Sequence, residues 1–339
     1  MLNSETLKKI ATVLFVLVIV LLIGNVLVTK FIVSKEIPKS REALSGIEID
    51  KIFNTALKNY GLYDQWISTK KIKQFNGDSL FKTYSIIIPK NLPVHLILLE
   101  LQELFWNDDV VLLSEEIKKS NKTFLKIFSE DKLKLAAEII YDNKIIREYG
   151  TVAFLISDNF KENDSRLNEI LKIPELYYLV LKPSSDSKKI LPLINKAGKR
   201  YALILNDHIT ELDYKLADNY SEDRLKRSIR EIVGTFYNAL FFIVDDKSDL
   251  CESSKYNFIE SELIKRKIFL AKKSNFIELN SNNLNTENKF NDFVKTLNKK
   301  DEKILFVNAD EYLTLSEIIP AYRKVGYKFI YPGDIVIKR

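Results

Sequence analysis

Four apolar segments in the C-terminal half of the chain each end in polar, mostly acidic residues. They read VAFLISDN, YALILND, LFFIVDD and ILFVNAD, and they begin at residues 152, 201, 240 and 304. Carboxylates in such positions can act as general bases in hydrolysis or bind divalent cations through oxygen. The candidate site residues are Asp158, Asn159, Asp207, His208, Asp245, Asp246, Asn308 and Asp310.

Each of these segments has the composition of a strand that is buried on both faces, as strands of a parallel sheet are. From Thr151 onward the chain alternates such strands with amphipathic helices, which predicts an α/β fold built as a complete or partial (β/α) barrel. The polar residues would then gather at the carboxyl edge of the sheet, where active sites of such folds are built. Helix capping and turn formation are the alternative explanation for the same residues.

The elements expected in this region can be given by their residue ranges. The expected strands, apart from the four segments above, are 176–181, 267–271, 276–279 and 328–331. The expected helices are 165–172, 187–197, 222–233, 254–265, 290–297 and 315–325.

Composition excludes several classes of protein. The 339 residues include only two histidines and one cysteine, so a histidine-rich metal site and an intrachain disulfide are excluded. The nine glycines form neither a GxGxxG pattern nor a phosphate-binding loop. The 52 basic and 46 acidic residues are interleaved without a basic stripe, and we therefore expect no nucleic-acid partner.

The N-terminal segment predicts a single membrane-spanning helix. Residues 11–29 carry no charge, and 19 residues suffice to cross a hydrocarbon core of about 30 Å. We interpret residues 1–33 as an uncleaved anchor, which contacts the membrane through residues 11–33, and 34–47 as a polar linker. Lysines on both sides leave the orientation open. Because such anchors more often precede an exported domain, we expect an extracytoplasmic, periplasmic location.

Residues 48–150 predict a small α+β domain that serves as an interaction or spacer module. Helices are expected near residues 49–57 and 92–105, and strands near 82–88, 110–113, 123–128 and 134–140. The aromatic residues Trp66 and Trp106, together with His95, are expected to be buried or half-exposed. This region contains no pattern typical of a catalytic centre.

The order of segments from Thr151 to Val336 resembles the divergent polysaccharide deacetylase family, whose members are envelope-associated relatives of the NodB-type deacetylases. The family opens with a strand that reads roughly IAIVIDDLG. This chain reads VAFLISDNF, so Asp158 matches the second aspartate and Ser157 replaces the first. The segments IPELYYLVLKP, AGKR and TLSEIIPAYRKVGYKFIYPGD match later family segments in the same order. The resemblance implies a distorted (β/α) barrel over residues 151–339, a polysaccharide as partner and Asp158 as the catalytic residue.

The chain departs from the family at the metal-binding histidines. Ile204 stands at the first of these positions, the second falls near Ile243 or Val244, and Asn308 stands at the third. His208 lies four residues beyond the first position and is not assigned that role. These departures favour a catalytically degenerate protein without a cofactor, whereas a divalent metal would be needed if the protein were active.

Three functions remain open from the sequence. The first is a membrane-anchored pseudoenzyme of the cell envelope that binds a glycan or an envelope protein through the former active-site cleft. The second is an active metal-dependent polysaccharide deacetylase in which carboxylates replace the missing histidines. The third is a purely structural envelope protein whose partner surface lies on the small domain.

Overall fold

The computed structural model describes residues 43–62, 64–71, 82–106, 108–117, 120–145, 147, 149–206, 208–279 and 285–337. The predicted membrane anchor and the candidate residue Asp207 lie outside these ranges. Within the described ranges, the helices are all too short or too polar to cross a membrane.

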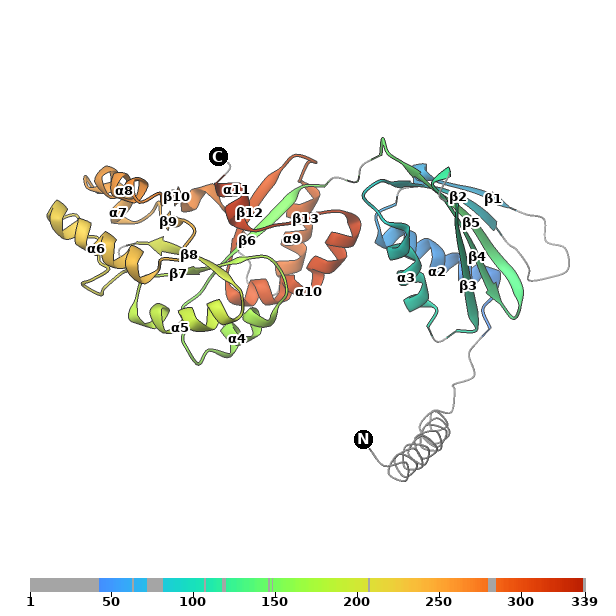
Figure 1. Cartoon of the computed structure of the whole chain (residues 1–339), viewed down its shortest axis with the longest axis horizontal. Coiled ribbons are helices and arrows are strands. Elements are labelled where there is room, and N and C mark those ends of the chain that lie inside the picture. The colour runs from blue at the N-terminus through green and yellow to red at the C-terminus, as the bar shows by residue number, and fades with distance from the viewer. Residues whose placement is uncertain are drawn as a thin grey trace, which may run out of the picture. The chain divides into compact units, whose positions relative to one another are not determined.

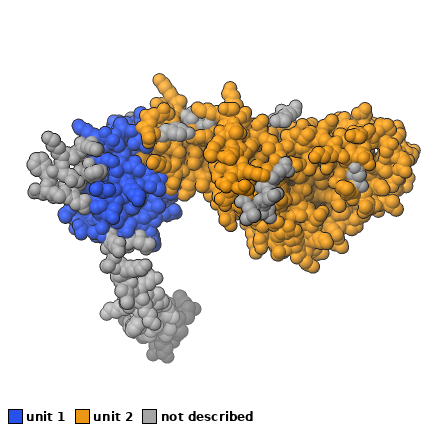
Figure 2. Space-filling view, turned by 180° about the vertical axis from the view of Figure 1, so that it is seen from behind, with its two compact units in different colours: residues 1–56, 67–87, 94–140 blue, residues 57–66, 88–93, 141–339 orange. Residues whose placement is uncertain are grey.

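The contacts between residues divide the chain into two units (Figure 2). The first unit contains residues 1–56, 67–87 and 94–140, and the second contains residues 57–66, 88–93 and 141–339. The second unit therefore takes in two short segments that precede residue 150.

The first unit is a five-stranded sheet with two helices on one face (Figure 1), and its β1–β2, β3–β4 and β4–β5 pairings are antiparallel. The strand order is β1-β2-β5-β4-β3. The helices are α2 (Gly46–Asn59) and α3 (Val94–Leu104), and Ile49 and Phe53 of α2 are fully buried. The strands are β1 (Ile67–Lys71), β2 (Lys82–Pro89), β3 (Val110–Ile117), β4 (Lys122–Ser129) and β5 (Lys132–Asp142).

The second unit contains an eight-stranded sheet in which every pairing of the described residues is parallel. The strand order is β10-β9-β8-β7-β6-β12-β11, and β13 also pairs with β6. The strands are β6 (Thr151–Ser157), β7 (Tyr178–Leu181), β8 (Arg200–Leu205), β9 (Phe242–Val244), β10 (Leu270–Lys272), β11 (Ile277–Glu278), β12 (Glu302–Val307) and β13 (Lys328–Phe329).

This strand order is that of a barrel with one opening. From β6 to β10 each strand lies beside the one that precedes it in the chain, and β12 returns to the free side of β6. The path of pairings is interrupted only between β10 and β11. The sheet is therefore a half-barrel of parallel strands with helices packed outside it.

The helices of the second unit confirm most of the sequence prediction. Residues 165–172 form α4 as predicted, and the helix predicted at 315–325 begins six residues earlier. The helices are α4 (Ser165–Lys172), α5 (Ser185–Lys196), α6 (Glu222–Thr235), α7 (Asp249–Glu252), α8 (Tyr256–Lys265), α9 (Thr286–Lys295), α10 (Ala309–Val325) and α11 (Pro332–Val336). Short 3₁₀ turns occur at η2 (Asp64–Trp66) and η4 (Lys273–Asn275).

The two faces of the barrel sheet belong to two separate apolar cores. Val152, Phe154 and Ile156 of β6 pack toward the outer helices, in a cluster with residues of α4 to α10. Ala153 and Leu155 belong to a second cluster, which fills the barrel interior with alternate residues of the other strands. This division follows from the two-residue repeat of a strand.

Helix α11 completes the interior core. Its residues Ile335 and Val336 are 2% and 6% exposed and belong to the interior cluster. Gly333 packs so closely on Tyr178 of β7 that a Cβ at this glycine would lie 2.5 Å from the tyrosine hydroxyl. The glycine is therefore required for the close approach of α11 to the barrel.

Candidate functional site at the mouth of the barrel

The alternation along the strands determines which polar residues can face the barrel interior at its carboxyl edge. Ser157 continues the inward series of Ala153 and Leu155, whereas Asp158 continues the outward series of Phe154 and Ile156. The residue that matches the second family aspartate thus lies on the helix side of the sheet.

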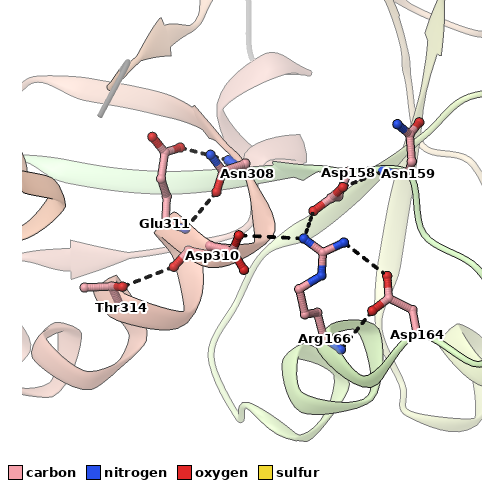
Figure 3. Close-up of polar contacts among 8 residues, drawn as sticks. All are labelled: Asp158, Asn159, Asp164, Arg166, Asn308, Asp310, Glu311 and Thr314. Carbon is pink, nitrogen blue, oxygen red and sulfur yellow. Dashed lines mark hydrogen bonds and ion pairs between the residues drawn. The ribbon is translucent and has the colours of Figure 1, made fainter. Parts of the chain in front are cut away.

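Asp158 contacts Arg166 of α4 from this position (Figure 3). Its Oδ2 lies 3.1 Å from the Nη1 of Arg166, and its Oδ1 accepts a hydrogen bond of 2.7 Å from the backbone N–H of Asn159. The same guanidinium lies 3.5 Å from Asp164 and 3.7 Å from Asp310. Three carboxylates from β6, α4 and α10 are therefore gathered around one arginine.

One positive charge from within the chain offsets part of the negative charge of this cluster. The Asp158 carboxylate, followed by smaller contributions from Asp164 and Asp310, holds the pKa of the Arg166 guanidinium above its usual value. The Arg166 side chain is 40% exposed, so solvent screens these pairs and each stabilises the fold only modestly. A guanidinium thus supplies the positive charge that a bound cation would otherwise supply to these carboxylates.

Helix α10 begins directly after the end of β12. Asn308 is the N-cap of α10: its side chain accepts a hydrogen bond from the N–H of Glu311, whose carboxylate accepts one from the N–H of Asn308. Asp310 lies in the first helical turn, where a negative charge is favoured by the helix dipole.

The remaining candidates form turns. The Oδ1 of Asn206 accepts a hydrogen bond from the N–H of His208, and Asp245 Oδ1 accepts one from Lys247 in the same way, both at 3.1 Å. Asp246 Oδ2 accepts a hydrogen bond of 2.6 Å from Ser274, which joins the end of β9 to η4. These side chains organise the loops at the mouth.

A polar pocket of about 400 Å³ lies over the ends of β6, β7 and β8. It brings together three of the predicted residues, Asp158, Asn159 and His208, whereas Asp245, Asp246, Asn308 and Asp310 are not part of its lining. The charged residues that line it and that the sequence analysis missed are Lys161, Lys182, Asp186 and Glu211.

The missed residues occupy loops and first turns of helices that have no distinctive pattern. Glu211, for example, accepts hydrogen bonds of 2.7 Å from both the N–H and the hydroxyl of Ser185 at the start of α5. Lys182 directly follows a strand, as the predicted residues do, so the same rule applied to lysine would have found it. For Arg166 the sequence gives no such signal.

The residues at the mouth do not fit a catalytic metal centre. Among the described residues, no three histidine, cysteine, aspartate or glutamate side chains are grouped so that they could hold an ion. Ile204 and Ile243, at or near two of the family's histidine positions, are 9% and 0% exposed within the interior apolar core. Neither side chain has a ligand atom, and we derive no reaction step through a metal.

Comparison with known proteins gives structural neighbours but no family assignment. No family model matches the sequence, and no curated protein matches it. An uncharacterized protein from Agrobacterium tumefaciens C58 is 13% identical, with a TM-score of 0.39 over 56% of this chain and 90% of its own.

Two further solved structures carry descriptions of function. A CE4 family pseudoenzyme from Bacillus anthracis is 10% identical, with a TM-score of 0.38 over 66% of this chain and 88% of its own. The peptidoglycan deacetylase PdaC from Bacillus subtilis, in a mutant form, is 13% identical, with a TM-score of 0.35 over 57% and 94%. The structural neighbours thus include family 4 carbohydrate esterases and pseudoenzymes of that family, all at low sequence identity.

Proposed function

We propose that this protein is a catalytically degenerate relative of the polysaccharide deacetylases that binds a glycan of the cell envelope at the mouth of its barrel. The observation that supports the proposal is a polar pocket at the mouth of the barrel in which the carboxylate of Asp158 is paired with Arg166. The choice of a polysaccharide as ligand rests on the resemblance in segment order.

The pocket has the size and chemistry to hold a sugar. Its volume of about 400 Å³ lies within the range of small-molecule sites. Its lining offers carboxylates, hydroxyls, an imidazole and lysine side chains, which can exchange hydrogen bonds with sugar hydroxyls and amides. Tyr177, Tyr178, Phe241 and Phe242 are at most 1% exposed, so they belong to the cores and offer no stacking surface. Tyr237 is 73% exposed but does not line the pocket. Recognition at this pocket would therefore rely on hydrogen bonds.

The loss of catalysis follows from what deacetylation requires. Metal-dependent amide hydrolysis needs a cation to activate water, a carboxylate to accept a proton and a group to protonate the leaving amine. Here Asp158 is directed toward Arg166, and Ile204 and Ile243 are apolar. The arrangement preserves a surface for binding and lacks the groups for turnover.

We also propose that the soluble part is held at the extracytoplasmic side of a membrane by residues 11–33. The support is the uncharged segment at residues 11–29, which is long enough to span the bilayer. A protein anchored there would meet envelope polysaccharides at the point where they are assembled or modified.

Titration calorimetry of the full-length protein with peptidoglycan fragments and chitooligosaccharides tests the binding proposal. We expect Asp186→Ala and Glu211→Ala to weaken binding at least tenfold. Asp223→Ala serves as the control, because its side chain is 92% exposed on α6 outside the pocket. Binding that is unaffected by both pocket variants, or no binding to either glycan class, would contradict the proposal.

Metal analysis tests the degeneracy separately. We expect no stoichiometric metal after dialysis against zinc, manganese and magnesium. A near-stoichiometric metal that disappears in Asp158→Ala, together with release of acetate from acetylated glycan, would instead support an active deacetylase.

A further inference from the structure

The chain enters the first unit beside the turn that joins β4 and β5. The backbone N–H of Leu44 donates a hydrogen bond of 3.0 Å to the Oγ of Ser129, which is the last residue of β4. Ser129 pairs with Val110, the first residue of β3. The start of α2, the end of α3 and the start of β3 therefore lie at one end of this unit, which we call the entry end (Figure 1).

Large apolar side chains are exposed at the entry end. Ile47 in the first turn of α2 is 67% exposed, Leu104 at the end of α3 is 40% exposed, and Trp106 is 70% exposed. Phe105 lies between the last two in the chain and is 4% exposed, so the core of the unit is closed here without their burial. Exposed apolar groups that gather at one place are typical of a surface that contacts a partner or a membrane.

The proposed membrane anchor limits how far the entry end can be from a bilayer. Residues 34–43, ten in all, separate the anchor at 11–33 from Leu44. A chain of ten residues spans at most about 35 Å when fully extended, and its root-mean-square length is about 18 Å when flexible. The entry end is thus tethered close to the bilayer, where its effective concentration is on the order of millimolar. The bilayer is therefore the partner that the tether brings to this end.

The charges of the entry end determine which force can drive contact with the bilayer. Asp50 is paired with Lys82 at 2.7 Å, and Glu130 lies 3.9 Å from Lys132. Acidic side chains outnumber basic ones among the described charged residues here, which are Glu48, Asp50, Lys51, Lys82, Glu103, Asp108, Asp109, Glu130, Asp131 and Lys132. The segment 34–43 adds Lys35, Lys39 and Arg41 against Glu36 and Glu42. Attraction to anionic lipids is therefore not expected, and contact would depend on the apolar side chains.

We propose that the entry end rests on the bilayer that holds the anchor, with the indole of Trp106 in the interfacial region and Leu104 and Ile47 beside it. Tryptophan is enriched at this depth because its ring is apolar and its N–H can bond to water or headgroups. Three side chains would bind a bilayer only weakly from free solution, but the tether removes most of the cost of association. This contact depends on the anchor proposed above and not on the proposed glycan binding.

Quenching of tryptophan fluorescence by brominated lipids tests this contact on the full-length protein in vesicles of phosphatidylcholine. The chain has only two tryptophans, so Trp66→Phe leaves Trp106 as the single reporter and Trp106→Phe leaves Trp66. We expect lipids brominated near the headgroup end of the acyl chain to reduce Trp106 emission at least twofold, more than lipids brominated deeper, and to leave Trp66 nearly unchanged. Phosphatidylglycerol in the vesicles should reduce the quenching at low salt, because the entry end is acidic.

Variants and flotation separate this contact from the anchor itself. In the Trp66→Phe protein, Leu104→Glu and Ile47→Glu should each reduce the quenching of Trp106 at least twofold, whereas Leu212→Glu, at a residue 66% exposed in the second unit, should not. Unchanged thermal denaturation will show that the variants remain folded. Flotation with the vesicles but an unquenched Trp106 would overturn this contact and leave the anchor standing, whereas failure to float would overturn both. Equal quenching of the two tryptophans, or a dimer in sedimentation that Trp106→Ala dissolves, would also overturn it.

Discussion

The mouth of the barrel and the edge strand β3 differ in whether their polar and apolar groups have partners within the chain. At the mouth, Asp158 is paired with Arg166, Asn308 caps α10, and Asp245 closes a turn. At the β3 edge, no described strand pairs with the outer side of β3, and the side chains of Val111 and Leu113 are 53% and 54% exposed. The polar residues at the barrel mouth, which the sequence marks as candidates for chemistry, thus mostly have partners within the chain. Strand β3, which has no such pattern in the sequence, has the more exposed side chains.

The difference shows that polar residues at strand ends can have a structural role without taking part in chemistry. A capping asparagine or a turn-forming aspartate contributes to folding wherever it occurs. Four predictions, ordered from the largest expected change in stability to the smallest, test this difference between the two regions.

Introducing histidines at the mouth should destabilise the protein the most. The double variant Ile204→His and Ile243→His places two imidazoles in the apolar interior, where each lacks a hydrogen-bond partner and replaces good packing. We expect a loss of about 4–6 kcal/mol in the free energy of unfolding, measured by urea denaturation.

Added zinc should recover little of that loss, because Asp158 is directed away from the interior toward Arg166. Full recovery by zinc would show that the mouth has the geometry of a metal site, which would contradict the structural role assigned to its polar residues. Ile264→His, at a residue 62% exposed on α8, is the control for the substitution itself.

The neighbouring aromatic residues at the end of α3 should behave differently from each other. Phe105 is 4% exposed, and Phe105→Ala should destabilise the first unit by about 3–4 kcal/mol. Trp106 is 70% exposed, and Trp106→Ala should change stability by less than about 0.5 kcal/mol. Thermal denaturation of the two variants checks this, and a comparable loss in both would show that Trp106 is a core residue.

Stability of the barrel should fall in acid through Glu262 on α8. Hydrogen bonds from Lys265 and Arg266 lower the pKa of this carboxyl from 4.5 to about 2. A lowered pKa in the folded state means that the stabilisation is complete above about pH 4.5 and disappears as the pH falls toward 2. The Lys265 side chain is 67% exposed, so screening limits the effect to about 1 kcal/mol.

Denaturation of wild type and Glu262→Gln between pH 7 and pH 2 measures this contribution. The two curves should converge at low pH. Equal stability of the two proteins at pH 7 would show that the ion pairs on α8 contribute nothing.

Removing the arginine at the mouth should have the smallest effect on stability. Arg166→Met leaves Asp158, Asp164 and Asp310 without their shared counter-charge, and we expect a loss below about 1 kcal/mol because the site is partly exposed.

Because no three carboxylates among the described residues are grouped so that they could hold an ion, we expect calcium and manganese to bind Arg166→Met no more tightly than wild type. Calorimetric titration with each ion measures the change, with Arg227→Met as control for an exposed arginine. A stoichiometric calcium or manganese site in Arg166→Met would show that Arg166 occupies a potential cation position.

Much of the fold could be predicted from the sequence because each element carried its own signal. Residues 165–172 form the predicted helix, since Asp164 provides the N-cap and Leu167 and Ile170 recur on the buried face. Strand β1 escaped prediction because the segment ISTKK lacks apolar alternation and is held by its pairing with β2. Helix α11 escaped because its five residues are held by the barrel interior.

The sequence by itself determined the alternation of strands and helices in the second unit, the polar character of the strand ends and the apolar residues Ile204 and Ile243 near two of those ends. Only the tertiary structure decided which of those polar groups meet. Asp158, Arg166 and Asp310 belong to three different elements and converge because β12 returns beside β6. Tertiary structure also decided on which side of the barrel sheet Asp158 lies and which strands come last in the order of the first sheet. Local signals depend on neighbours in the chain, whereas both of these outcomes depend on which strands lie side by side.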